Sequence, residues 1–143
     1  NLEVFMNPYL KTYQKNEVET ASPEKILILL YDGAIQFLNK AKIAMKDNNI
    51  AEIHNNIMSC EEIIEEFINT VDEEKGGEFA VRIKALYQYF YNTLVMANIK
   101  KDESKIDEVL RHLVDLRATW KQAIAIANSQ RAQLSSGVSD YEG

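Results

Sequence analysis

The sequence of 143 residues has few of the residues that interrupt helices or cross-link chains. Two prolines and five glycines leave long stretches without a helix breaker, which favours helices. Cys60 is the only cysteine, so an internal disulfide is excluded and a reducing compartment, the cytoplasm, is expected. No uninterrupted apolar run reaches the roughly 18 residues of a membrane-spanning helix, so stable membrane insertion is not expected. The length suits one domain with a real core.

Clustered positive charge is also missing. The chain has 16 lysines and arginines against 22 aspartates and glutamates, and its net charge is −6. A phosphate-binding surface needs clustered Lys and Arg, so nucleic acid is not expected as a partner. Residues 47–78 hold ten acids against one base, Lys75, which indicates a solvated helix face and an exposed loop or, alternatively, an electrostatic docking surface.

Residues that could carry catalysis or hold a metal are scarce. Neither His54 nor His112 has a glutamate three residues before it, so the Glu-x-x-His motif of a di-iron bundle is absent. Cys60 falls on an apolar stripe and is expected to fill the core. Four glutamates lie close together without a histidine or an apolar pocket to raise a pKa, and they are expected to be solvated. They are Glu61, Glu62, Glu65 and Glu66. There is no phosphate loop and no Gly-x-Ser-x-Gly, so neither an enzyme nor a cofactor is predicted.

Apolar residues recur at steps of three and four along four segments, and this spacing predicts four amphipathic helices. Ser22-Pro23-Glu24 marks the start of the first, with Ser as cap, Pro in the first turn and Glu at the positive end of the helix dipole. The stripes are Leu27, Tyr31, Ala34, Leu38, Ala41 and Met45; Ile50, Ile53, Ile57, Cys60, Ile64, Phe67 and Val71; Ala80, Ile83, Tyr87, Phe90, Leu94 and Ala97; and Ile106, Val109, Leu113, Leu116, Trp120, Ala123 and Ala127. Trp120 is expected to be largely buried.

The breaks between these segments are short and polar. They are expected at 47–49, at 72–77, which contains a Gly pair, and at 100–104. Short loops leave no length for a crossover, so the predicted fold is all-α, an antiparallel up-and-down four-helix bundle over residues 22–128. Residues 129–143 are expected to form a polar, disordered tail.

Residues 1–21 are expected to form a short, mobile N-terminal segment. The first five residues lack the basic end and apolar stretch of a signal peptide. Met6, followed by Asn-Pro, is a candidate natural start, which would make residues 1–5 a remnant of cloning. The sequence leaves open whether those five residues are native.

The apolar pattern also contains a surplus. Residues 26–31 are six apolar residues in a row, and the third helix carries a second stripe of Leu86, Tyr89 and Met96. A four-helix core needs only one face of each helix. Two compatible explanations remain open. The N-terminal segment could fold back over the surplus, or the surplus could form a groove for the amphipathic helix of a partner.

Several short motifs occur in a fixed order along the chain. They are Asn7-Pro8-Tyr9, Tyr13-Gln14-x-Asn16-x-Val18-x-Thr20, Ala21-Ser22-Pro23, Leu30-Tyr31-Asp32-Gly33-Ala34, Glu74-Lys75-Gly76-Gly77-Glu78, Leu86-Tyr87-x-Tyr89, Ala97-Asn98 and Leu116-Arg117-x-x-Trp120-Lys121. Each motif alone is weak, but the ordered set on four correctly spaced helices is specific. From about Asn7 to about Ala125 the sequence resembles the flagellin-specific export chaperone family, the FliS family.

This resemblance implies a cytosolic chaperone that binds the C-terminal segment of flagellin and prevents its premature polymerisation. It also implies delivery of the complex to a component of the membrane export gate, for flagellar type III export. In the family the N-terminal segment covers part of the groove when no client is bound, and Leu10 and Tyr13 fall at its apolar and tyrosine positions. A disordered client that folds on binding loses chain entropy and needs a long interface, which an elongated bundle with surplus apolar surface offers.

The surplus and the resemblance together predict eight residues that contact the client. They are Leu10, Tyr13, Leu30, Tyr31, Ala34, Leu86, Tyr89 and Met96. Tyr31 and Ala34 fit the core pattern equally well. The free protein is expected to be a monomer or a weak dimer. The rival interpretation is a homo-oligomeric structural bundle that buries the surplus stripe between copies of the chain.

Overall fold

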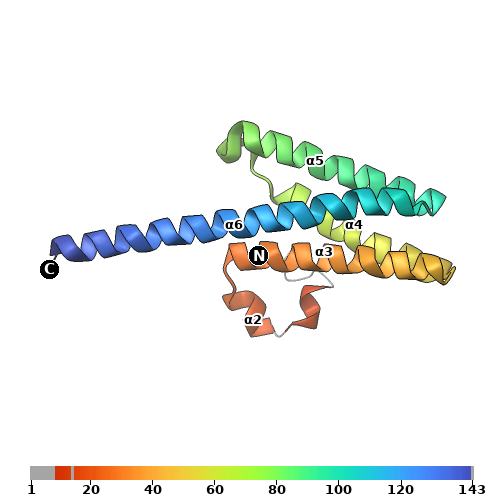
Figure 1. The fold of residues 1–143 in the computed structure, drawn as a ribbon, viewed down its shortest axis with the longest axis horizontal. Helices are drawn as coiled ribbons and strands as arrows, with labels where there is room; N and C mark the ends of the chain where they lie inside the picture. The colour runs from red at the N-terminus through yellow and green to blue at the C-terminus, as the bar shows by residue number, and fades with distance from the viewer. Residues whose placement is uncertain (1–8, 14, 143) are drawn as a thin grey trace.

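The computed structural model describes residues 9–13 and 15–142, and within these residues the regular structure is entirely helical. A short 3₁₀ turn, η1, and a short helix, α2, precede four long helices (Figure 1). The elements are η1 (Leu10–Thr12), α2 (Lys15–Thr20), α3 (Pro23–Lys46), α4 (Ile50–Thr70), α5 (Glu73–Lys100) and α6 (Glu103–Glu142). The predicted all-α fold is confirmed. Whether residues 1–5 are native concerns positions outside the described residues.

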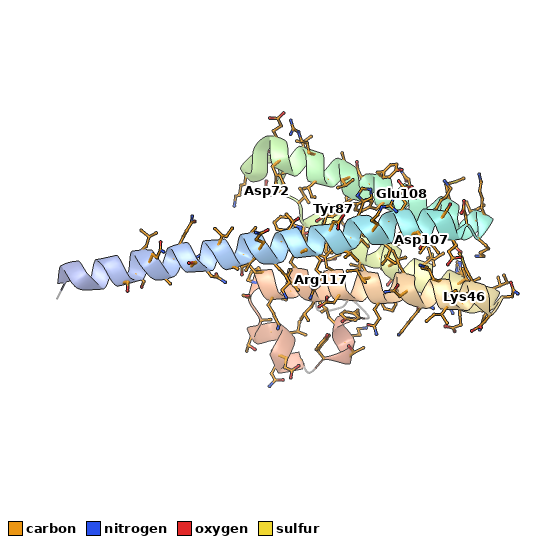
Figure 2. All side chains as sticks on the ribbon, in the orientation of Figure 1. Lys46, Asp72, Tyr87, Asp107, Glu108 and Arg117 are labelled. Atoms are coloured by element: carbon orange, nitrogen blue, oxygen red, sulfur yellow. The ribbon has the colours of Figure 1, made fainter. Side chains whose placement is uncertain are left out.

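The four long helices run alternately up and down and enclose one core. α3 packs against α4 and α6, and α5 packs against the same two helices, so α3 and α5 lie diagonally across the bundle. Two ion pairs join α3 to α6: Lys42 with Asp107 at 2.7 Å, and Asp32 with Arg117. Figure 2 shows Asp107 and Arg117 on α6, and η1 and α2 lie along the outer side of α3.

The helix boundaries follow from local chemistry. The Ser22 hydroxyl accepts a hydrogen bond from the Lys25 backbone N–H, and Pro23 occupies the first turn, as predicted. Asn48 has a φ of 52° between α3 and α4, and the Asn49 side chain caps α4 by accepting from the Glu52 N–H. The break predicted at residues 47–49 is therefore confirmed.

The loop predicted at residues 72–77 is shorter in the structure. The Asp72 side chain accepts from the Lys75 N–H, so the helix begins at Glu73. Gly77, with φ 60° and ψ −141°, then breaks the helical geometry, and α5 resumes after it. Aspartate is a strong N-cap, and only glycine takes such a positive φ without strain, so the Gly pair makes a kink where a full loop was expected.

The last helix is longer than the sequence predicted. α6 runs to Glu142, past the expected boundary at Asn128, and extends beyond the other helices (Figure 1). Ile126 and Leu134 are exposed on this extension. Ala, Gln and Arg are good helix formers, so a composition that indicated a polar tail is also compatible with continued helix.

The predicted core is largely confirmed. The buried stripe residues include Tyr31, Leu38, Cys60, Phe67, Phe90 and Leu113. Two stripe residues differ. Ile50 lies in the first turn of α4 at the end of the bundle and is exposed, and Ala123 of α6 is exposed as well. His54 is exposed and its Nδ1 lies 2.9 Å from Asn98 Nδ2, whereas the His112 ring is half-buried against Phe90.

The four neighbouring glutamates of α4 do not form one solvated face. Glu62 and Glu65 are exposed, Glu66 is half-buried, and Glu61 is only 5% exposed. The expectation of a solvated face is therefore wrong for Glu61. Burial raises the pKa of its carboxyl. A residue at the edge of the buried stripe of a helix becomes buried when a neighbouring helix packs on that side. The spacing of apolar residues in α4 does not show on which side its neighbour packs, so the burial of Glu61 could not be predicted from it.

Candidate protein-binding surface

The eight residues predicted to contact a client lie in three separate places. One pair belongs to the N-terminal segment beside α3, three residues lie inside the core, and three lie along α5. In that order they are Leu10 and Tyr13; Leu30, Tyr31 and Ala34; and Leu86, Tyr89 and Met96.

The N-terminal segment is held against α3 by an aromatic contact. The Tyr9 ring packs on Gly33 so closely that a Cβ atom there would lie 2.7 Å from the ring. Its centroid is also 6.0 Å from that of Phe37, and its hydroxyl lies 3.1 Å from the hydroxyl of Tyr13. Burial and the contact with Tyr13 raise the pKa of Tyr9. Because Gly33 has no side chain, it leaves room for the Tyr9 ring.

Two apolar side chains of the same segment are also buried. Leu10 is 1% exposed and Val18 is buried as well, while their neighbours Lys11 and Glu17 are exposed. Burial of such side chains contributes roughly 1.5–3 kcal/mol each relative to leaving them in water. These buried side chains help to hold the segment on the bundle.

The three residues inside the core are inaccessible in this structure. Leu30 is 3% exposed, and Tyr31 and Ala34 have no exposed surface. The Tyr31 hydroxyl lies 2.6 Å from that of Tyr87, and burial raises the pKa of both phenols. As this structure stands, all three serve the core.

Each long helix contributes one ring to an aromatic cluster around Tyr31. The cluster consists of Tyr31 (α3), Phe67 (α4), Tyr87 (α5) and Trp120 (α6). The Tyr31 and Phe67 rings stack at 4.7 Å between centroids, and Phe67 and Tyr87 lie 5.0 Å apart. The Trp120 indole N–H donates to the Tyr31 hydroxyl at 3.1 Å. Trp120 is half-buried, which is less than predicted, and its ring also meets the exposed ring of Phe79.

The third group of predicted residues lies on the flank of α5 that faces α6. Leu86 is half-buried, while Tyr89 and Met96 are 49% and 39% exposed. Tyr89 donates a hydrogen bond to Glu108 of α6, whose position beside α5 is labelled in Figure 2. This hydrogen bond raises the pKa of Tyr89 and holds its exposed ring beside α6.

The sequence analysis missed Phe79 as a member of this surface. Its side chain is 61% exposed, and its ring meets Trp120 edge-on with centroids 6.0 Å apart. The signal was present, because Phe79 precedes Leu86 by two helical turns and therefore shares its flank of α5. We call Phe79, Leu86, Tyr89 and Met96 together the α5 apolar flank.

The described residues offer little for catalysis. In this part of the chain no group of three His, Cys, Asp or Glu side chains could hold a metal ion. Cys60 is fully buried, and its burial together with the nearby Glu61 raises the pKa of its thiol, which disfavours the nucleophilic thiolate. Of the helices the structure describes, none is long and apolar enough to cross a membrane. The arrangement suits binding by apolar contact.

Comparison with known proteins gives a consistent result. A family model described as flagellar protein FliS matches residues 5–127. The chain is 34% identical over 125 residues to the flagellar secretion chaperone FliS of Bacillus subtilis, covering 87% of this chain and 92% of that one. It is 33% identical over 110 residues to the protein of the same name from Campylobacter jejuni, covering 77% and 86%. For the Salmonella typhimurium protein the identity is 29% over 126 residues, covering 87% and 93%.

Proposed function

This chain belongs to the FliS family of flagellar proteins, as its motifs predicted, and we propose that it binds the C-terminal segment of flagellin in the cytosol before export. A flagellar export chaperone role follows from the family. The finer proposal is that binding prevents premature polymerisation and that the complex is passed to a component of the export gate. We further propose that the chain is a binding protein without enzymatic activity.

The observation that carries the proposal is the α5 apolar flank. Phe79, Tyr89 and Met96 expose large apolar side chains at helical spacing on one side of one helix. An amphipathic helix of a partner protein binds such a surface by packing its own apolar face against it. A client segment that is disordered when free would fold against this flank and cover it.

The other predicted residues would contact the client only in later steps of binding. Leu10 and Tyr13 become available when the N-terminal segment leaves α3, and the surface of Gly33 and Phe37 that Tyr9 covers is then open to the client. Leu30, Tyr31 and Ala34 would reach the client only if the helices separated. We therefore propose the α5 apolar flank as the first contact and the N-terminal segment as the second.

Titration calorimetry with a synthetic flagellin C-terminal peptide tests this proposal. We expect the Phe79→Ser, Met96→Ser double variant to bind at least tenfold more weakly than the parent, because both side chains are anchors of the proposed interface. The matched control is Val81→Ser, Ile99→Ser, which removes two exposed apolar side chains of the same helix from a different flank. An equal loss in both double variants would show that the α5 apolar flank is not the site.

Sedimentation separates this proposal from the rival one. A homo-oligomeric bundle would bury the α5 apolar flank between copies, so Phe79→Ser, Met96→Ser would convert an oligomer to a monomer. We expect instead that the parent is a monomer or a weak dimer and that the flagellin peptide sediments with it. An oligomer that excludes the peptide would support the structural role.

A further inference from the structure

The last helix continues beyond the helices against which it packs. Tyr89 of α5 is hydrogen-bonded to Glu108, and Phe79 contacts Trp120, so α5 and α6 run antiparallel. The same register, carried to the start of α5, places that start level with about residue 126 of α6. From there α6 extends past the bundle (Figure 1).

One side of α6 carries uncharged, exposed residues in line with the α5 apolar flank. Ile126 follows Glu108 by about five helical turns, so both side chains lie on one line along α6. Tyr89 donates to Glu108, so this line borders the α5 apolar flank. Four exposed residues follow one another on this side at steps of three and four. They are Ala123, Ile126, Gln130 and Leu134, which we call the α6 strip.

The α6 strip gains from a partner that covers it. Ile126 is 53% exposed and Leu134 is 71% exposed, so two large apolar side chains face water on this strip. A single helical segment gains little stability by itself in water, and helices in proteins are stabilised mostly by the packing of an apolar face. A helix that packs along the strip would bury both side chains and stabilise the extension.

The continuity of the two surfaces indicates which partner this is. Along the seam between α5 and α6 the exposed apolar side chains follow in the order Met96, Tyr89, Phe79, Ile126 and Leu134. One amphipathic helix that lies on the α5 apolar flank would therefore meet the α6 strip next. By the rise of an α-helix this path is about 45 Å long. Such a length suits a segment that is disordered when free, because a long interface offsets its loss of chain entropy.

We propose that the α6 strip prolongs the flagellin-binding surface, so that the bound C-terminal segment of flagellin packs on the α5 apolar flank and continues past the bundle along Ile126 and Leu134. This inference rests on the proposed function, because it concerns the same client. It adds a contact beyond the residues shared with the family, since Leu134 lies outside the matched residues 5–127.

Titration calorimetry of the full chain with a long flagellin C-terminal peptide tests the α6 strip. We expect the Ile126→Ser, Leu134→Ser double variant to bind at least tenfold more weakly than the parent, because it removes both apolar contacts of the strip. Both side chains are exposed, so the bundle should stay folded. The matched control is Ile43→Ser, Ile50→Ser, which removes two similarly exposed isoleucines from the opposite end of the bundle and should leave the affinity unchanged.

Hydrogen exchange of the parent gives a second readout. We expect exchange in residues 127–137 to become slower when the peptide binds. Unchanged exchange there, or equal affinity of the parent and the Ile126→Ser, Leu134→Ser variant, would overturn this inference and leave the proposed function standing. A parent that does not bind the peptide at all would overturn both. A dimer of the parent that the same double variant abolishes, with peptide affinity unchanged, would assign the strip to a second copy of the chain and would also overturn the inference.

Discussion

The hydroxyl oxygens of Tyr31 and Tyr87 lie 2.6 Å apart in the core, which links two helices that do not pack side by side. Trp120 donates to Tyr31, so the Tyr31 oxygen accepts one hydrogen bond and can donate its own proton to Tyr87. This small polar network joins α3, α5 and α6 inside an otherwise apolar cluster. Buried networks of this kind are costly when only partly satisfied.

Tyr31→Phe should therefore be more destabilising than Tyr87→Phe. The first change removes both the hydroxyl that accepts from the Trp120 N–H at 3.1 Å and the partner of the Tyr87 hydroxyl, whereas the second leaves the Trp120–Tyr31 hydrogen bond intact. We expect a loss of about 1–3 kcal/mol for Tyr31→Phe and about half as much for Tyr87→Phe. Urea unfolding of both variants and of the double variant measures this difference, and equal losses would show that Trp120 does not depend on Tyr31.

Trp120→Ala should also be strongly destabilising. The indole touches Phe79 and donates to Tyr31, but its outer side is open. We expect a loss of about 3 kcal/mol, the lower end of the range for removing a large aromatic side chain. The same unfolding experiment reports it, with Thr119→Ala as the exposed control on the same helix. A midpoint unchanged from that of the parent would place Trp120 outside the core.

The buried Glu61 predicts a specific dependence of stability on pH. Burial raises the pKa of this carboxyl in the folded state, so the folded chain holds the proton more tightly than the unfolded chain. Its contribution to stability is therefore greatest at low pH and declines as the pH rises above the ordinary glutamate value of about 4.3. Glu61→Gln should lose this dependence and be at least as stable as the parent at neutral pH. Thermal melts from pH 4 to 7 would contradict this if parent and variant shifted in parallel.

The helices and their buried faces could be predicted from the sequence because both depend on local spacing. The cap at Ser22 and the stripe through Tyr31, Leu38 and Ala41 are examples. The contacts that shape the candidate surface could not be predicted, because they join residues distant in the chain. Nothing near Gly33 in the sequence indicates that Tyr9 covers it, and nothing near Glu61 indicates that it is largely buried.

Gly33→Ala should displace the N-terminal segment from α3. A Cβ atom at this position would lie 2.7 Å from the Tyr9 ring, too close for the present contact to persist. Alanine also favours the helix over glycine by roughly 1 kcal/mol, so the bundle itself should remain folded. Hydrogen exchange should become faster in residues 9–20 and stay slow in α3. Gly137→Ala, where a Cβ meets nothing within 4 Å, is the matched control and should leave exchange in residues 9–20 unchanged.

The N-terminal segment either competes with the client or helps to hold it, and the Leu10→Ala, Tyr13→Ala double variant distinguishes these roles. Leu10 is almost fully buried against the bundle, and Tyr13 is hydrogen-bonded to Tyr9, so both would be freed when a client displaces the segment. A leucine and a tyrosine released beside a newly folded apolar helix would otherwise stay in water, which favours their docking on the client. We therefore expect the double variant to bind the flagellin peptide about tenfold more weakly, with the bundle still folded, since contacts of this size contribute roughly 1–3 kcal/mol. Titration calorimetry measures the change, and Lys11→Ala, an exposed position of the same segment, is the control. Unchanged affinity would mean that the segment is only a tether, and tighter binding would mean that it acts purely as an inhibitory lid.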